Sequence, residues 1–158
     1  MTSSISLKEQ LIQHLKGGMA FLPADKFISE IPFDKLSAIP DGLPYSLWQQ
    51  FWHMMYAQRD ILDFCVDTDY KEPAWPDDYW PGDTAPENKD AWDSVLRKFY
   101  EDRDKLIEII QDESTDLFAP LANDPSKNLF REIMLVIEHN AYHSGQMLVI
   151  ARQLGLHN

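Results

Sequence analysis

Apolar residues recur at helical spacing in four segments of this 158-residue chain, and proline or glycine interrupts the sequence between the segments. Apolar side chains three and four positions apart form one face of a helix, and that face must be buried. We find no strand-like alternation of apolar and polar residues that competes with this pattern. The sequence therefore predicts an all-α protein, a four-helix bundle formed by one domain over residues 1–158. The expected helices span residues 5–16, 47–66, 90–111 and 126–154.

Short polar residues stand where three of these helices are expected to begin. Ser4 or Ser6 is placed to cap the first helix, and Ser46 is placed to cap the second. The fourth helix follows a turn sequence at residues 123–125, so we expect it to start at about Ser126. These residues favour helix starts because their side chains accept hydrogen bonds from free backbone amides.

The segment between the second and third helices, residues 67–88, contains four prolines and cannot form a continuous helix. Three aromatic residues, Trp75, Tyr79 and Trp80, are interleaved with these prolines. Aromatic side chains in such a segment usually pin it onto the bundle, and this is the interpretation we favour. The alternative is a lid over a pocket.

The expected fourth helix is apolar on two sides. One stripe suits a bundle core, and the other must line an interior cavity or a subunit interface. A homodimer is therefore expected as one way to bury the second stripe. The first stripe comprises Ile133, Ile137, Ala141, Leu148 and Ala151; the second comprises Leu135, Val136, Met147 and Ile150 and also carries His139 and His143.

Charge and composition exclude several classes of function. The formal net charge is −12, from 26 acidic and 14 basic residues, so we expect no binding to nucleic acid or to anionic membranes. No segment is apolar enough to cross a bilayer, and residues 1–8 lack the features of a signal peptide. We therefore expect a cytoplasmic protein. A single cysteine, Cys65, excludes an internal disulfide and is expected in the core.

Three of the five histidines form a candidate metal site. His139 and His143 stand four residues apart, so both project from one face of the fourth helix. His53 lies in the middle of the second helix, away from its main apolar stripe. These residues by themselves leave two possibilities open, a site for one divalent metal ion or buried structural histidines. His14 and His157 are expected at the surface or the chain terminus.

Two established metal motifs are missing. The chain has no HExxH sequence, since Glu138 directly precedes His139 and points elsewhere on the helix. The Glu-x-x-His pairs of di-iron bundles are also missing. Glu132, two turns before His139, is the one carboxylate that we can name as a supplementary ligand or base.

The sequence resembles the DinB-like family of metal-binding four-helix bundles over nearly its whole length. The resemblance runs through GGMAF, PDGLPYSLWQQFWHMMYAQRDIL and PAWPDDYWPGD, and the closing EHNAYHSGQMLVIARQLG is its most specific part. In that family, one histidine of the second helix and two of the last helix hold the metal. The resemblance assigns these roles to His53, His139 and His143, and it also implies a dimer.

The resemblance implies a function but does not fix the reaction. Characterised relatives include thiol S-transferases that use low-molecular-weight thiols, so we expect metal-dependent transfer of such a thiol to a small electrophile. A metal-dependent hydrolase and a non-catalytic metal-binding protein are the alternatives. Three histidines suit zinc, nickel or iron and leave a coordination position open. Candidate residues around the metal are Gln49, Tyr56, Glu132 and Gln146.

Overall fold

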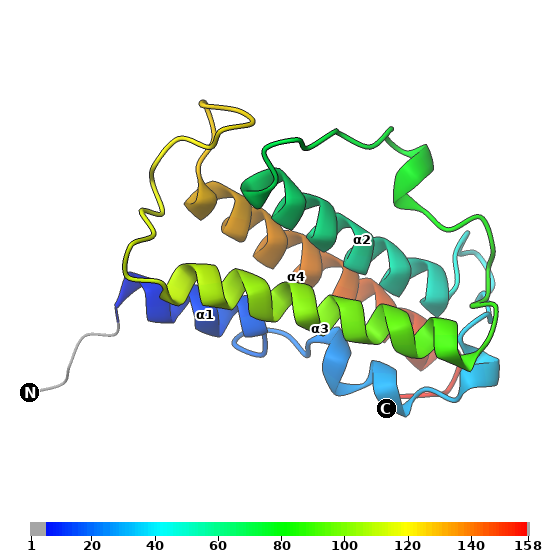
Figure 1. Ribbon diagram of the computed structural model, residues 1–158. Helices are drawn as coiled ribbons and strands as arrows, with labels where there is room; N and C mark the ends of the chain where they lie inside the picture. Colours follow the sequence, from blue (N-terminus) through cyan, green and yellow to red (C-terminus); the bar gives the residue numbers. More distant parts are fainter. Residues whose placement is uncertain (1–5, 158) are drawn as a thin grey trace, which may run out of the picture.

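The computed structural model describes residues 6–157, and Ser4 and Ile5 lie outside this range. It contains the four predicted helices: α1 (Leu7–Lys16), α2 (Leu47–Val66), α3 (Lys89–Gln111) and α4 (Leu129–Gln153). α2 packs against α3 and α4, and α1 contacts the same two helices from the other side (Figure 1). The predicted all-α bundle is confirmed.

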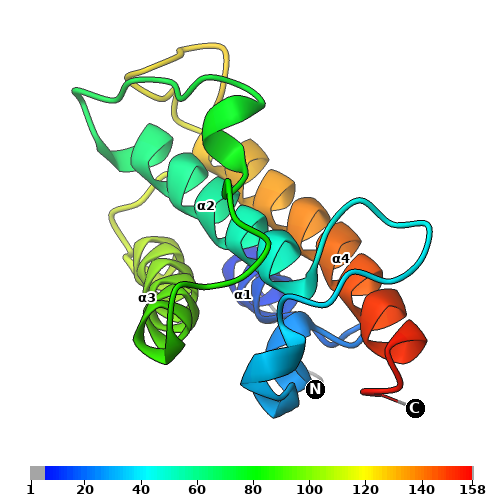
Figure 2. The same cartoon turned by 90° about the vertical axis from the view of Figure 1, so that its right-hand side faces the viewer.

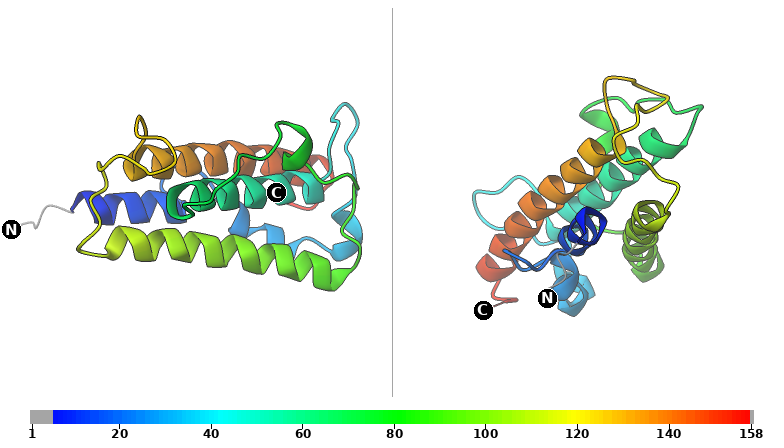
Figure 3. Two further views of the ribbon diagram at one scale, coloured as in Figure 1. Left: turned by 45° about the horizontal axis from the view of Figure 1, so that its top comes forward. Right: turned by 90° about the vertical axis from the view of Figure 1, so that its left-hand side faces the viewer.

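α1 is much shorter than the other three helices. The space beyond its end is filled by three helical turns, η1 (Ala24–Lys26), η2 (Ile28–Glu30) and η3 (Phe33–Lys35). Phe27, Ile28 and Leu36 from this stretch are fully buried. In Figure 3 these light-blue turns continue the layer of α1 along the bundle. These side chains share one buried cluster with Phe51 of α2 and Met147 of α4.

The helix starts follow the chemistry of their caps. The Ser6 and Ser46 hydroxyls accept from the backbone amides of Glu9 and Gln49, as predicted. α4 begins at Leu129, three residues after the expected start at about Ser126, and Asn128 caps it. Ser126 instead donates its amide and hydroxyl hydrogens to the Asp124 carboxylate in a turn.

Two clusters of buried side chains form the core. One is centred on the aromatic rings of Phe51, Trp92 and Phe99 at the end of the bundle that holds η1 to η3. The other surrounds Leu106 and Ile133 at the end that holds α1. Cys65 is partly buried against this second cluster, and its burial raises the thiol pKa to about 12. The thiol therefore stays protonated at neutral pH.

The two apolar stripes of α4 merge into one buried band. Val136, Met147 and Ile150 of the second stripe are almost completely buried within this chain. Ile137 and Leu148 of the first stripe are only half-buried. The expectation that the second stripe needs a cavity or a second subunit is therefore wrong for those three residues. At about 100° per residue, Val136 and Met147 lie next to Ile133 and Ala151 around the helix, so the buried face of α4 takes residues from both stripes.

The segment between α2 and α3 lies across α2 and contains a short helical turn, η4 (Asp77–Tyr79). Figure 2 shows this green segment leaving the end of α2, passing over the helix and descending to α3. Among residues 6–157, no helix is both long and apolar enough to cross a bilayer.

Candidate metal centre

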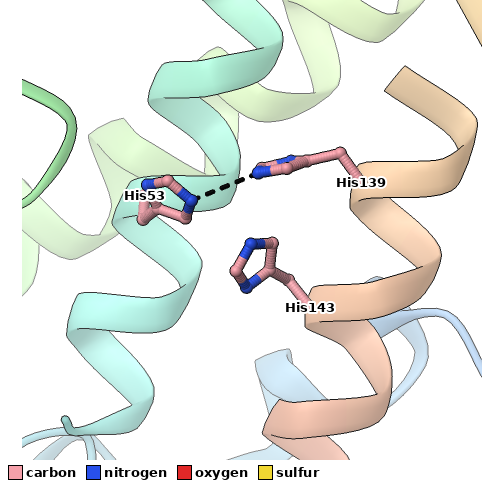
Figure 4. Close-up of side chains that lie close together, drawn as sticks. All are labelled: His53, His139 and His143. Carbon is pink, nitrogen blue, oxygen red and sulfur yellow. Dashed lines mark hydrogen bonds between the residues drawn. The ribbon is translucent and has the colours of Figure 1, made fainter. Parts of the chain in front are cut away.

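Three histidines meet in the space between α2 and α4. His53 comes from the middle of α2, and His139 and His143 come from successive turns of α4 (Figure 4). One ring nitrogen of each lies within 4.8 Å of the corresponding nitrogens of the other two. Contacts between α2 and α4 are the most extensive in the bundle, so these helices hold the rings together. His14 is exposed on α1, and His157 packs against Phe27 near the end of the chain.

Hydrogen bonds fix which nitrogen of two rings carries the proton. The Nδ1 atom of His53 lies 2.8 Å from the backbone carbonyl oxygen of Tyr79. The Nδ1 atom of His143 lies 2.7 Å from the Gln50 side-chain oxygen. Both oxygens only accept, so each Nδ1 carries the hydrogen and each Nε2 carries a lone pair when the ring is neutral. Such outer partners orient the histidines of metal sites.

Burial keeps the three rings neutral. Burial, with a smaller contribution from the neighbouring imidazoles, lowers the pKa of His143 to about 3 and that of His139 to about 4. Burial also lowers the pKa of His53, although the Tyr79 carbonyl partly opposes this shift. Neutral imidazole is the form that binds a metal ion. The cluster is therefore ready to accept a cation at neutral pH without first losing protons.

The spacing of the nitrogens fits a metal ion. The Nε2 atoms of His53 and His139 are 3.1 Å apart. Two nitrogens bound at about 2.0–2.1 Å to a tetrahedral ion would stand roughly 3.3 Å apart. Three histidines also leave at least one coordination position for a further ligand, as in catalytic sites. The cluster of three histidines could therefore hold a metal ion.

The histidines line a pocket of about 380 Å³ that opens to the surface. Trp80 forms one wall, with its ring parallel to that of His53 at a centroid distance of 4.0 Å. The ring of Tyr45 is also stacked with that of Trp80, at a centroid distance of 6.2 Å. Trp75 and Tyr142 are 70% and 63% exposed at the mouth. The segment that carries Trp75 and Trp80 thus packs onto the bundle, as the favoured interpretation predicts. It also forms part of the wall of the pocket.

The four residues predicted around the metal lie in different places. Gln146 lines the pocket and donates to the Tyr142 hydroxyl. Gln49 accepts from the Ser46 amide and completes the cap of α2. Tyr56 stacks on Trp52 and contacts the ring of Tyr79 edge-on.

Glu132 lies apart from the histidine pocket. It is buried on α4, bonds to Arg131 and lines a separate cavity that also contains Asp60 and Tyr70. The residues found to line the histidine pocket include no carboxylate. The described structure therefore does not bring Glu132 together with the three histidines.

Sequence analysis missed Gln50 and the backbone of Tyr79 as partners of the histidines. Gln50 is 1% exposed and stands three residues before His53, so it shares that face of α2. A glutamine beside a histidine on the buried side of a helix was the available signal. No feature of the sequence predicts the contact between the Tyr79 carbonyl and His53, because it depends on how residues 67–88 fold back onto α2.

Asp60 holds that segment against α2. Its two carboxylate oxygens accept hydrogen bonds from the hydroxyls of Tyr70, at 2.8 Å, and Tyr79, at 2.6 Å. Both tyrosines belong to residues 67–88, and Asp60 lies two turns after His53 on α2. The side chain of Tyr79 is thus fixed to α2 at one point while its carbonyl orients His53 at another.

Comparison with known proteins gives one match. The model of the DinB family matches residues 23–158 and so includes all three histidines. No curated protein and no solved structure matches the chain significantly. The family match covers nearly the whole chain, and it agrees with the helical bundle and the histidine cluster described above. The chain belongs to the DinB family.

Proposed function

We propose that this protein binds one divalent metal ion through His53, His139 and His143 and transfers a low-molecular-weight thiol to a small electrophile. The observation that carries the proposal is the convergence of three neutral imidazoles on an open, aromatic-walled pocket. A bound zinc, nickel or iron ion would supply a Lewis acid that lowers the pKa of a thiol in the open position. That the ion is zinc, nickel or iron and that the ligand is a low-molecular-weight thiol are both part of this proposal.

Different residues of the chain have different roles around that ion. Gln50 and the Tyr79 carbonyl hold His143 and His53 in the tautomers that present Nε2. Trp80, Tyr45 and Tyr142 supply an apolar surface for the electrophile and limit access of water. In the reaction, the thiol releases its proton to solvent and its sulfur forms a bond to the electrophilic carbon. The leaving group departs with the electrons of the broken bond.

Two alternatives have less support. A hydrolase needs a base beside the metal-bound water, and the residues found to line the pocket include no carboxylate. A purely structural ion usually has four protein ligands, whereas the described cluster has three. The open position and the surrounding pocket therefore favour a ligand-binding role over a structural one.

Thiol consumption tests the proposal. Metal-loaded protein is mixed with a thiol and an electrophilic alkyl or epoxide probe, and loss of the thiol and formation of the thioether are followed. The expected result is product formation that stops when His143 is replaced by alanine or the metal is removed. Hydrolysis of an ester without thiol consumption would favour the hydrolase, and absence of any turnover would favour the metal-binding protein.

The homodimer stays a prediction. Met134, Tyr142 and Val149 are exposed apolar side chains on α4, and a second copy that packs on this helix would cover them. Light scattering with size-exclusion chromatography measures the mass directly. A mass of two chains is expected, and the mass of one chain across the accessible concentration range would contradict the prediction.

A further inference from the structure

His139 differs from the other two histidines in its hydrogen bonds. Its Nδ1 atom is buried and has no partner among the residues that the structure describes. Its Nε2 atom points at Nε2 of His53, 3.1 Å away (Figure 4). His53 keeps its hydrogen on Nδ1, where it donates to the Tyr79 carbonyl, so its Nε2 carries a lone pair. A hydrogen bond between the two Nε2 atoms therefore requires neutral His139 to carry its hydrogen on Nε2.

The next residue of α4, Asn140, also has a buried atom without a partner. Its Oδ1 atom accepts no hydrogen bond from any of residues 6–157. Burial chiefly lowers the pKa of His139, and hydrogen bonding to the Asn140 side chain opposes that shift, so the ring and this oxygen lie within reach of each other. With its hydrogen on Nε2, however, His139 has only a lone pair at Nδ1. Two acceptors cannot bond to each other, and this accounts for both unpaired atoms.

Bonds to two other helices fix the direction of the Asn140 amide. Gln58 of α2 donates through Nε2 to the backbone carbonyl of Phe99 on α3, at 2.8 Å. A carbonyl only accepts, so the Gln58 amide must turn its nitrogen to α3 and its oxygen to Asn140. Asn140 donates to that oxygen through Nδ2, at 2.9 Å. Both bonds are buried, so turning either amide over would be costly. Asn140 Oδ1 is thus held as the atom that is free to accept from another group.

We propose that Asn140 is a positioning residue for His139, and that His139 changes tautomer when it binds a metal ion. This inference rests on the metal-binding part of the proposed function. When His139 uses Nε2 as a ligand, that nitrogen loses its hydrogen and Nδ1 gains one, so the ring stays neutral and no net proton is released. The new Nδ1–H group donates to Asn140 Oδ1, and both unpaired atoms gain a partner. Gln50, the Tyr79 carbonyl and Asn140 then hold one histidine each.

Nitrogen-15 NMR of the histidine side chains tests the change of tautomer in the wild type alone. Long-range nitrogen–proton correlations report which ring nitrogen carries the hydrogen. At pH 7, His139 is expected to carry it on Nε2 in metal-free protein and on Nδ1 in Zn²⁺-loaded protein. His53 and His143 are internal controls, because both are expected to carry it on Nδ1 in the two states. A His139 ring that already carries its hydrogen on Nδ1 without metal would overturn the inference.

Two variants of Asn140 test its role as the acceptor. Asn140→Leu and Asn140→Asp both lose the N–H group that bonds to Gln58, but only Asn140→Asp keeps an oxygen for His139. In competition with a chromophoric chelator, Zn²⁺ affinity is expected to fall on the order of tenfold in Asn140→Leu and to stay at or above that of the wild type in Asn140→Asp. The hydrogen-bonded Nδ1 hydrogen of His139 should give a downfield, slowly exchanging resonance in the Zn²⁺-loaded wild type and Asn140→Asp. Asn140→Leu should lack this resonance.

The outcomes separate this inference from the function on which it rests. A rival donor for Asn140 Oδ1 is Arg103, whose buried Nε atom also lacks a partner in the described structure and which lines the same small cavity. If Asn140→Leu lowers the free energy of unfolding but keeps the Zn²⁺ affinity and the His139 resonance, the inference is overturned while metal binding stands. Equal losses of affinity in the two variants would also overturn it, because the lost bond to Gln58 would then explain both. If the wild type binds no Zn²⁺, the metal function and the inference both fail.

Discussion

The Nδ1 atom of His53 lies 2.8 Å from the backbone carbonyl oxygen of Tyr79, which is 26 residues further along the chain. The segment that forms part of the pocket wall therefore sets the orientation of a histidine on α2. Asp60 fixes the side chain of the same tyrosine to α2. The segment and the histidine cluster thus form one hydrogen-bonded unit, and this leads to a first prediction.

Tyr79→Phe is expected to weaken metal binding about tenfold. The change removes the hydrogen bond to Asp60, so the carbonyl that orients His53 is held less firmly. Tyr70→Phe is the matched control, because Tyr70 also bonds to Asp60 but its carbonyl has no recorded bond to a histidine. Competition with a chromophoric chelator measures both affinities. Equal losses in the two variants would contradict this role for Tyr79.

Gln50→Leu is expected to weaken metal binding about tenfold to a hundredfold. It removes the acceptor for His143 Nδ1 and leaves that buried N–H without a partner. Gln50→Glu keeps an acceptor oxygen at nearly the same place and should retain most of the affinity. The same chelator competition applies, with circular dichroism to confirm that both variants are folded. If the Glu variant loses as much affinity as the Leu variant, the hydrogen bond does not explain the effect.

Acid is expected to destabilise the metal-free protein through its histidines. Folding lowers the pKa of His139 to about 4 and that of His143 to about 3, from an ordinary value of 6.5. Between about pH 4 and 6.5 the unfolded chain therefore binds more protons, and the free energy of unfolding falls as the pH falls.

Urea unfolding of metal-free protein at pH 7 and pH 5 measures this effect. A His139→Gln, His143→Gln double variant should show a smaller loss of stability than the wild type over this interval. The comparison removes the contribution of the carboxylates, which both proteins share. An identical pH dependence for the two proteins would show that these histidines keep ordinary pKa values in the folded state.

Asn128→Ala is expected to lower the free energy of unfolding by about 1 kcal/mol. The Asn128 side chain accepts from the Arg131 amide and caps α4. Ser126→Ala is the control at the expected start of the helix, and it should cost less because Ser126 lies in the preceding turn. Chemical denaturation of the two variants measures the loss in free energy of unfolding for each. A larger loss for the Ser126 variant would contradict the helix start in the structure.

The helices and the histidine pair could be predicted because they depend on local spacing. Apolar periodicity gave α2 its bounds, and a separation of four residues places His139 and His143 on one helix face. His53 was added to that pair because it lies in the middle of a helix that was expected to pack against the fourth, and the family resemblance then assigned all three the role of ligands. The structure then brings one ring nitrogen of each histidine within 4.8 Å of those of the other two.

The remaining features depend on tertiary packing. The partnership of Gln50 with His143 exists only because α2 and α4 pack in one particular register. The Tyr79 carbonyl reaches His53 through a proline-rich segment whose path has no periodic signal. Which residues of the two stripes of α4 are buried depends on how α4 packs against its neighbours. None of these follows from residue spacing in one helix.

Metal content per chain tests the central claim most directly. Plasma mass spectrometry is applied to the purified wild type, His53→Ala and His143→Ala, with His14→Ala as the control for an exposed histidine outside the cluster. The account predicts close to one divalent ion per chain in the wild type and the control, and far less in the two other variants while they remain folded. A folded wild type that contains no metal and cannot be reloaded with zinc, nickel or iron would contradict it.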